Sequence, residues 1–230
     1  MYPLLTLAPS WIEAEVGTIV GMLAIRGVAN PRHHEAIDRL ASELEAELRG
    51  RYAGQDRAEI QATPPLPAYA AYYRRFGQHY HVGMQLESVA LKGKSLPRVA
   101  ALVEAMFVAE LRHGILTAGH DLDAVTLPIT LGVGNGAESF TMPNGETATV
   151  KDGDIYTATA EGVLSAIITG PSAVARIADT TTAALFVVYA PPGVPQDLVN
   201  THLDEIEANV RLIAPQATTA ARVLGIAGSA

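Results

Sequence analysis

Residues 72–123 read YYRRFGQHYHVGMQLESVALKGKSLPRVAALVEAMFVAELRHGILTAGHDLD, and this stretch separates two kinds of structure along the chain. Apolar residues recur in it at helical spacing, as Val99, Leu102 and Met106 do. This spacing places them on one face of a helix. Together with the few residues before it, the stretch predicts helices over residues 67–76, 82–92 and 96–113.

The rest of the chain surrounds these helices with strands. Residues 17–28 (GTIVGMLAIRGV) are β-branched and apolar, which predicts a buried strand. Residues 31–50 form an amphipathic pattern that begins with proline at the first helical position and ends at glycine. Further along, the pattern predicts short strands within residues 126–189 and a last helix over residues 195–213. This order predicts an α+β fold with a large β core.

The composition limits the domain count and the compartment. With 230 residues, of which 49% are apolar and 17% charged, the chain has ample material for a core. We expect one domain over residues 1–214 and a frayed tail over residues 215–230. The apolar runs are too short to cross a bilayer, and the start lacks the pattern of a secretory signal. We therefore expect a cytoplasmic protein with no membrane partner.

One segment is basic although the chain carries a net charge of −8. It holds five of the chain's 16 lysines and arginines within 25 positions: Arg74, Arg75, Lys92, Lys94 and Arg98. The overall charge argues against tight RNA binding, because nucleic-acid binders neutralise phosphates with a basic surface. If RNA binds at all, we expect these five side chains to supply the phosphate contacts.

Several polar clusters could carry chemistry. His79 and His81 lie one residue apart, and His120 precedes Asp121 and Asp123. These residues could ligate a metal ion, but no supporting ligand spacing is present, and we favour polar loop residues. The two aspartates could form an acid–base pair, and here we favour a turn. Without cysteine there is no thiolate site, and no motif predicts a cofactor.

A series of short motifs in a fixed order resembles the tRNA-editing module of the phenylalanyl-tRNA synthetase beta chain, meaning its third and fourth B domains. The resemblance covers roughly residues 68–190. The motifs are Arg75-Phe76-Gly77, Lys92-Gly93-Lys94, Leu96-Pro97-Arg98-Val99, Leu102-Val103-Glu104, Arg112-His113-Gly114, Asp121-Leu122-Asp123, residues 136–140, Ser172-Ala173-Val174, residues 177–182 and the strand at residues 185–188.

The resemblance implies sandwich-like sheets flanked by helices, with a pocket that binds the end of a mischarged tRNA and hydrolyses its ester. Met106 and Phe107 stand where the family has threonine and asparagine, and Ala118 stands where the family has its pocket histidine. The candidate pocket residues are His79, His81, His120, Asp121 and Glu138.

Two functions remain open from the sequence. The chain could recognise an aminoacyl-tRNA end or an amino acid, and could hydrolyse mischarged tRNA in trans. Alternatively, it could be a non-catalytic binding protein for a small metabolite or an RNA, which the apolar residues Met106, Phe107 and Ala118 favour. A scaffold without a pocket function is a third possibility. The sequence leaves the amino acid, the tRNA and the oligomeric state open.

Overall fold

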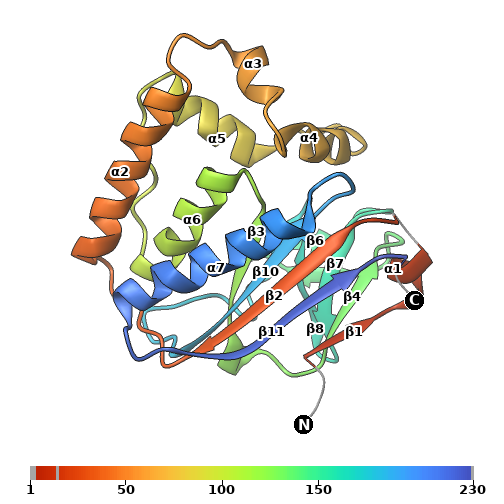
Figure 1. Cartoon of the computed structure of the whole chain (residues 1–230). Helices are drawn as coiled ribbons and strands as arrows, with labels where there is room; N and C mark the ends of the chain where they lie inside the picture. Colours follow the sequence, from red (N-terminus) through yellow and green to blue (C-terminus); the bar gives the residue numbers. More distant parts are fainter. Residues whose placement is uncertain (1–3, 14–15, 229–230) are drawn as a thin grey trace.

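The computed structural model describes residues 4–13 and 16–228 and has the predicted α+β fold, with helices packed against β-sheets (Figure 1). The helices are α1 (Pro9–Glu13), α2 (Glu35–Arg51), α3 (Arg57–Gln61), α4 (Leu66–Arg74), α5 (His81–Ala90), α6 (Ala101–His113) and α7 (Gln196–Ile213), with a short 3-10 helix at Leu122–Ala124. The strands are β1 (Leu5–Leu7), β2 (Ile19–Arg26), β3 (Thr117–Asp121), β4 (Ile129–Val133), β5 (Ser139–Thr141), β6 (Thr147–Thr149), β7 (Ile155–Thr159), β8 (Gly162–Ala166), β9 (Gly170–Pro171), β10 (Ala183–Ala190) and β11 (Thr218–Ile226).

The core is a sandwich of two sheets. One sheet has the strand order β11-β2-β10-β3 and the other the order β1-β4-β7-β8-β9. The side chain of Tyr189 on β10 reaches Thr157 on β7 and Ser165 on β8, so the inner faces of the two sheets meet there. The eight residues of β10 are all buried, as expected for a central strand covered on both faces.

Helix α7 covers the outer face of the four-stranded sheet (Figure 1). Its apolar face contains Val199, Leu203 and Ile206, all fully buried. Gly21 on β2 allows this close packing, because a Cβ atom there would lie 3.0 Å from Leu203 Cδ1 and 3.1 Å from Val199 Cγ1. Helices α2 and α6 pack beside α7 and extend the helical layer past the edge of the sheet at β3.

Two helices begin later than the sequence pattern predicts. The predicted helix over residues 31–50 begins at Glu35, because Asn30 does not cap it; the Asn30 side chain instead accepts from the amide of Leu102 at 2.9 Å. The predicted helix over residues 96–113 begins at Ala101. Residues 96–100 precede the helix, and two of their backbone amides donate to glutamate side chains. The Leu96 amide donates to Glu45 and the Val99 amide donates to Glu104, each at 2.8 Å.

The prediction of a frayed tail over residues 215–230 was wrong for its described part. Residues 218–226 form β11, an edge strand paired antiparallel to β2 along its whole length. The small residues that weaken the sequence pattern let this strand approach its neighbours, since a Cβ at Gly225 would lie 3.2 Å from Leu5 Cδ2. Residues 229–230 of the predicted tail lie outside the described residues. Within the described part of the chain, no helix is long and apolar enough to cross a membrane.

Candidate functional site

A pocket of about 980 Å³ lies beside β3, the edge strand of its sheet, between α6 and the segment that follows β8. Its walls are mainly apolar. Helix α6 contributes Val103, Met106 and Phe107, and Ile167 and Ile177 come from the opposite wall. A pocket of this size and character suits a small organic ligand better than an ion.

One side of the pocket carries a buried polar network. The Ser165 hydroxyl oxygen lies 2.7 Å from the Tyr189 hydroxyl, 2.9 Å from the Thr157 hydroxyl and 3.3 Å from His120 Nε2. Thr157 and Tyr189 also contact each other at 2.9 Å. These four side chains are at most 1% exposed, and Ser165, His120 and Tyr189 line the pocket. The network therefore gives an apolar cavity a few fixed donors and acceptors.

His120 is a neutral imidazole near neutral pH. Burial lowers its pKa to about 4, and a backbone hydrogen bond with Ala175 acts in the opposite direction. His120 can therefore orient a polar group, but its low pKa makes it a weak proton acceptor.

Glu110 and Thr117 line a second polar part of the pocket. Glu110 is 3% exposed, and its Oε1 accepts from the Thr117 amide at 2.8 Å. Burial raises the pKa of Glu110 to about 8, and this hydrogen bond opposes the shift. Glu110 is therefore a buried carboxyl whose charge state is sensitive to whatever occupies the pocket.

A chain of hydrogen bonds leads from Thr117 to the surface of α7. Thr117 Oγ1 lies 2.6 Å from His202 Nε2, and His202 Nδ1 lies 3.2 Å from His113 Nδ1. His113 Nε2 lies 3.1 Å from a carboxylate oxygen of Glu205. Burial and the nearby His113 lower the pKa of His202 to about 3, and burial also lowers the pKa of His113. Both imidazoles are therefore neutral near neutral pH.

The structure brings two of the five predicted pocket residues, His81 and His120, to the cavity. His81 is the first residue of α5, and its Nδ1 lies 3.3 Å from the Tyr73 hydroxyl. Partial burial lowers the pKa of His81, although its side chain stays exposed to solvent at the pocket. His79 is exposed two residues earlier and does not line the cavity.

Asp121 and Glu138 have structural partners outside the cavity. Asp121 accepts from the Asp123 amide at 3.0 Å and from the Thr181 hydroxyl at 2.7 Å, so the favoured turn interpretation is confirmed. Glu138 accepts from the amide of Asn135 at 3.2 Å, in the loop before β5. Within the described residues, no group of three or more histidine, aspartate or glutamate side chains is placed to hold a metal ion.

The five basic candidates lie on three different segments of the structure. Arg74 and Arg75 lie at the end of α4, whereas Lys92 and Lys94 follow the far end of α5. Between the two pairs along the chain lie a short turn and the ten residues of α5, about 15 Å of helix. Arg75 also packs over the Tyr72 ring, with its guanidinium carbon 5.2 Å from the ring centroid.

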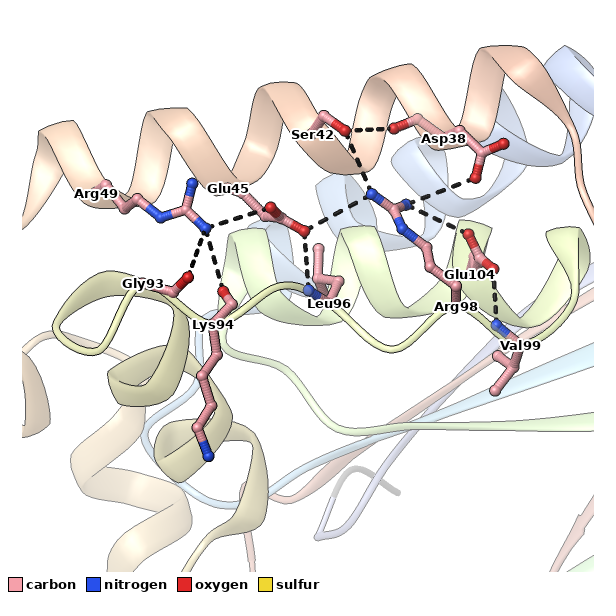
Figure 2. Close-up of polar contacts among 10 residues, drawn as sticks. All are labelled: Asp38, Ser42, Glu45, Arg49, Gly93, Lys94, Leu96, Arg98, Val99 and Glu104. Atoms are coloured by element: carbon pink, nitrogen blue, oxygen red, sulfur yellow. Dashed lines mark hydrogen bonds and ion pairs between the residues drawn. The ribbon is translucent and has the colours of Figure 1, made fainter.

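Arg98 forms ion pairs with carboxylates of the protein itself (Figure 2). Its guanidinium lies 3.4 Å from Glu104, 3.7 Å from Glu45 and 3.9 Å from Asp38. These carboxylates leave little of its charge for an external phosphate. The Lys94 side chain points away from this cluster in Figure 2, while Arg49 holds the Lys94 carbonyl at 3.2 Å.

Sequence reasoning missed part of the site. It did not single out Glu110, Thr117 or Tyr189, and it did not select the cations Arg32 and Arg176, which also line the cavity. The one available signal was a glutamate four residues after Met106, on the apolar side of the helix over residues 96–113. The remaining residues are brought together by strand pairing, which no local pattern reveals.

No family model and no curated protein sequence matches this chain. Among solved structures, it is similar to an N-terminal fragment of the phenylalanyl-tRNA synthetase beta-subunit from Pyrococcus horikoshii, with 10% sequence identity and a TM-score of 0.47. The match covers 96% of this chain and 49% of that fragment, so this chain spans about half of its length.

Proposed function

We propose that the pocket binds a small molecule with a largely apolar body, and that this molecule is an amino acid or the aminoacyl end of a tRNA. The observation that carries the proposal is the cavity of about 980 Å³, apolar at Val103, Met106 and Phe107 of α6 and polar at His120, Ser165 and Glu110. Buried polar groups inside an apolar cavity fix the orientation of a ligand whose remaining surface is apolar.

The motif resemblance supports the aminoacyl part of the proposal. It places Ala118 where the family has its pocket histidine and Met106 and Phe107 where the family has threonine and asparagine, and all three line this cavity. At each of these three positions the chain carries an apolar side chain where the family has a polar one. The cavity therefore has fewer polar groups than the family's pocket would have at the same positions. Such a change favours holding a ligand over reacting with it.

Ester hydrolysis is the second candidate, and one contact favours it. His120 Nε2 lies 3.3 Å from Ser165 Oγ, within reach for an imidazole that orients a hydroxyl or a water molecule. However, a base with a pKa of about 4 takes a proton inefficiently near neutral pH. Binding is therefore the function that the geometry supports best.

Binding and hydrolysis are separated by one pair of measurements. The first is saturation-transfer NMR with the proteinogenic amino acids and their 3′-aminoacyl-adenosine esters, which carry the chemistry of a charged tRNA end. The second is ester cleavage of the same compounds and of mischarged tRNAs. We expect saturation transfer to apolar members without cleavage above the uncatalysed rate. Cleavage that His120→Phe abolishes would favour hydrolysis, and the absence of any binding would refute the proposal.

A further inference from the structure

We propose that Glu110 and Thr117 form an ammonium subsite, so that the ligand of this pocket presents a protonated primary amine to the inner end of α6. This inference rests on the proposed function, since it adds a defined chemical group to the ligand of the same cavity. It concerns residues that neither the motif resemblance nor the sequence-based site predictions include.

The first observation is the incomplete hydrogen bonding of Glu110. Its Oε1 accepts from the Thr117 amide, whereas its Oε2 has no hydrogen-bond partner among residues 4–13 and 16–228. That oxygen is not sealed inside the protein, and the residue lines the pocket. A buried carboxylate oxygen without a partner is costly, so a donor from a bound ligand would satisfy it.

The second observation is the direction of the hydrogen-bond chain behind Thr117. The Glu205 carboxylate can only accept, so His113 donates to it from Nε2 and its Nδ1 accepts. His202 then donates from Nδ1 towards His113, and its Nε2 accepts from the Thr117 hydroxyl. This order holds because both rings are neutral.

The hydroxyl of Thr117 therefore offers only lone pairs to the pocket. The two acceptors, the Thr117 hydroxyl oxygen and Glu110 Oε2, belong to neighbouring residues that both line the cavity and are joined by the bond from the Thr117 amide to Glu110 Oε1. A ligand carboxylate or carbonyl would meet acceptors alone when Glu110 is ionised. An ammonium group, which has several N–H donors, matches both.

The surroundings of Glu110 contain no compensating charge. The groups that sense its charge are the hydroxyls of Tyr69, Tyr73 and Tyr80, whose pKa values burial raises, so that they stay neutral. His202 and His81 face the same region from α7 and α5, and burial lowers the pKa of each. Arg32 and Arg176, cations that also line the cavity, are exposed and do not contribute to the shift in the pKa of Glu110, so a ligand cation would complete the pair when Glu110 ionises.

The test uses two compounds of matching shape, 4-phenylbutylamine and 4-phenylbutan-1-ol, titrated calorimetrically into the purified full chain. We expect the unmodified protein to bind the amine more tightly than the alcohol by about tenfold or more, the effect of one charge-assisted hydrogen bond. Glu110→Gln should remove this preference, because the glutamine side chain can still accept from the Thr117 amide but carries no charge to pair with the ammonium group.

Binding of the amine should also release protons. Below the pKa of about 8, Glu110 is largely protonated in the free protein and must ionise to pair with the ammonium group. Titrations near neutral pH in buffers of different ionisation enthalpy should therefore report close to one proton released with the amine and none with the alcohol. This readout needs no variant and remains decisive if Glu110→Gln fails to fold.

Thr117→Ser and Thr117→Val provide the matched pair for the second acceptor. Serine should keep the preference for the amine, and valine should weaken it. Equal affinities for the amine and the alcohol, without proton release, would overturn the subsite while leaving an apolar binding pocket intact. Failure of both compounds to bind would overturn the subsite and the proposed function together.

Discussion

The Nε2 atom of His120 lies 3.3 Å from the hydroxyl oxygen of Ser165, a contact that joins the two sheets at the pocket. His120 belongs to β3, the edge strand of one sheet, and Ser165 belongs to β8 of the other. Both are 1% exposed, so the pocket acquires a polar side exactly where the sandwich would otherwise be apolar. This contact makes the fold and the site depend on the same residues.

Replacing His120 with phenylalanine should make the protein less sensitive to acid. The folded-state pKa of about 4 lies below the ordinary histidine value of 6.5, so the unfolded chain binds the proton first as the pH falls. Stability from this group is present above about pH 6.5 and is lost towards pH 4, by roughly 3 kcal/mol. Urea unfolding at several pH values measures this, and an unchanged acid dependence in the variant would contradict it.

Glu110→Gln should make the protein less sensitive to alkaline pH. The folded-state pKa of about 8 lies above the ordinary glutamate value of 4.5, so this group favours the folded state at low pH. That contribution is lost as the pH rises through about 8. The variant should therefore melt at a higher temperature than the unmodified protein near pH 9, and by a smaller margin near pH 5. A constant difference in melting temperature across this range would show that Glu110 does not titrate as described.

Substitutions at Arg98 should affect stability, whereas substitutions at Lys92 and Lys94 should affect only RNA binding. Arg98→Ala removes the cation beside the buried Glu104 and leaves the buried Glu45 paired with Arg49 alone. We expect a loss of about 2 kcal/mol, below the range for fully buried pairs because Arg98 keeps 30% of its side chain exposed. Lys92→Ala with Lys94→Ala should leave stability unchanged. If tRNA binds, the double variant should flatten the salt dependence of its affinity. Denaturant unfolding and binding measured against salt concentration test both parts.

Gly21→Ala should destabilise the contact between β2 and α7. The added Cβ would lie 3.0 Å from Leu203 and 3.1 Å from Val199, and the crowding should cost about 1–3 kcal/mol. Gly50→Ala is the matched control, because it lies in α2 with no atom within 4 Å of the added Cβ. It should stabilise the protein by up to about 1 kcal/mol. Equal effects of the two changes on the unfolding free energy would contradict the packing described for α7.

The sequence predicts the fold better than it predicts the site. The period of the apolar residues predicted the bounds of α7 to within one residue and placed most of the strands between residues 126 and 189. Such periods are visible in the sequence because one face of each element is buried. The sequence also favoured a turn at Asp121, a local effect of a short acidic side chain. The start of α6 was missed, since long-range bonds from Glu45 to Leu96 hold residues 96–100 outside the helix.

The pocket depends on contacts between residues that lie far apart in the sequence. Ser165 and Tyr189 meet because β8 and β10 face each other across the sandwich, and Thr117 meets His202 because α7 packs beside β3. None of these pairs has a local signature. His120 was a candidate from its sequence neighbours, and its role in the polar network became visible only through the sheet pairing.

The most direct test of the central claim is to fill the pocket. Ala118 lines the cavity on β3, on the same face of the strand as His120, and Ala118→Phe would fill space there, whereas Ala118→Ser changes the volume little. The measurement is saturation-transfer NMR with the apolar amino acids and their 3′-aminoacyl-adenosine esters against the three proteins. We predict signals with the unmodified protein and Ala118→Ser, and none with a folded Ala118→Phe variant. Undiminished signals with Ala118→Phe would place the ligand elsewhere and contradict the account.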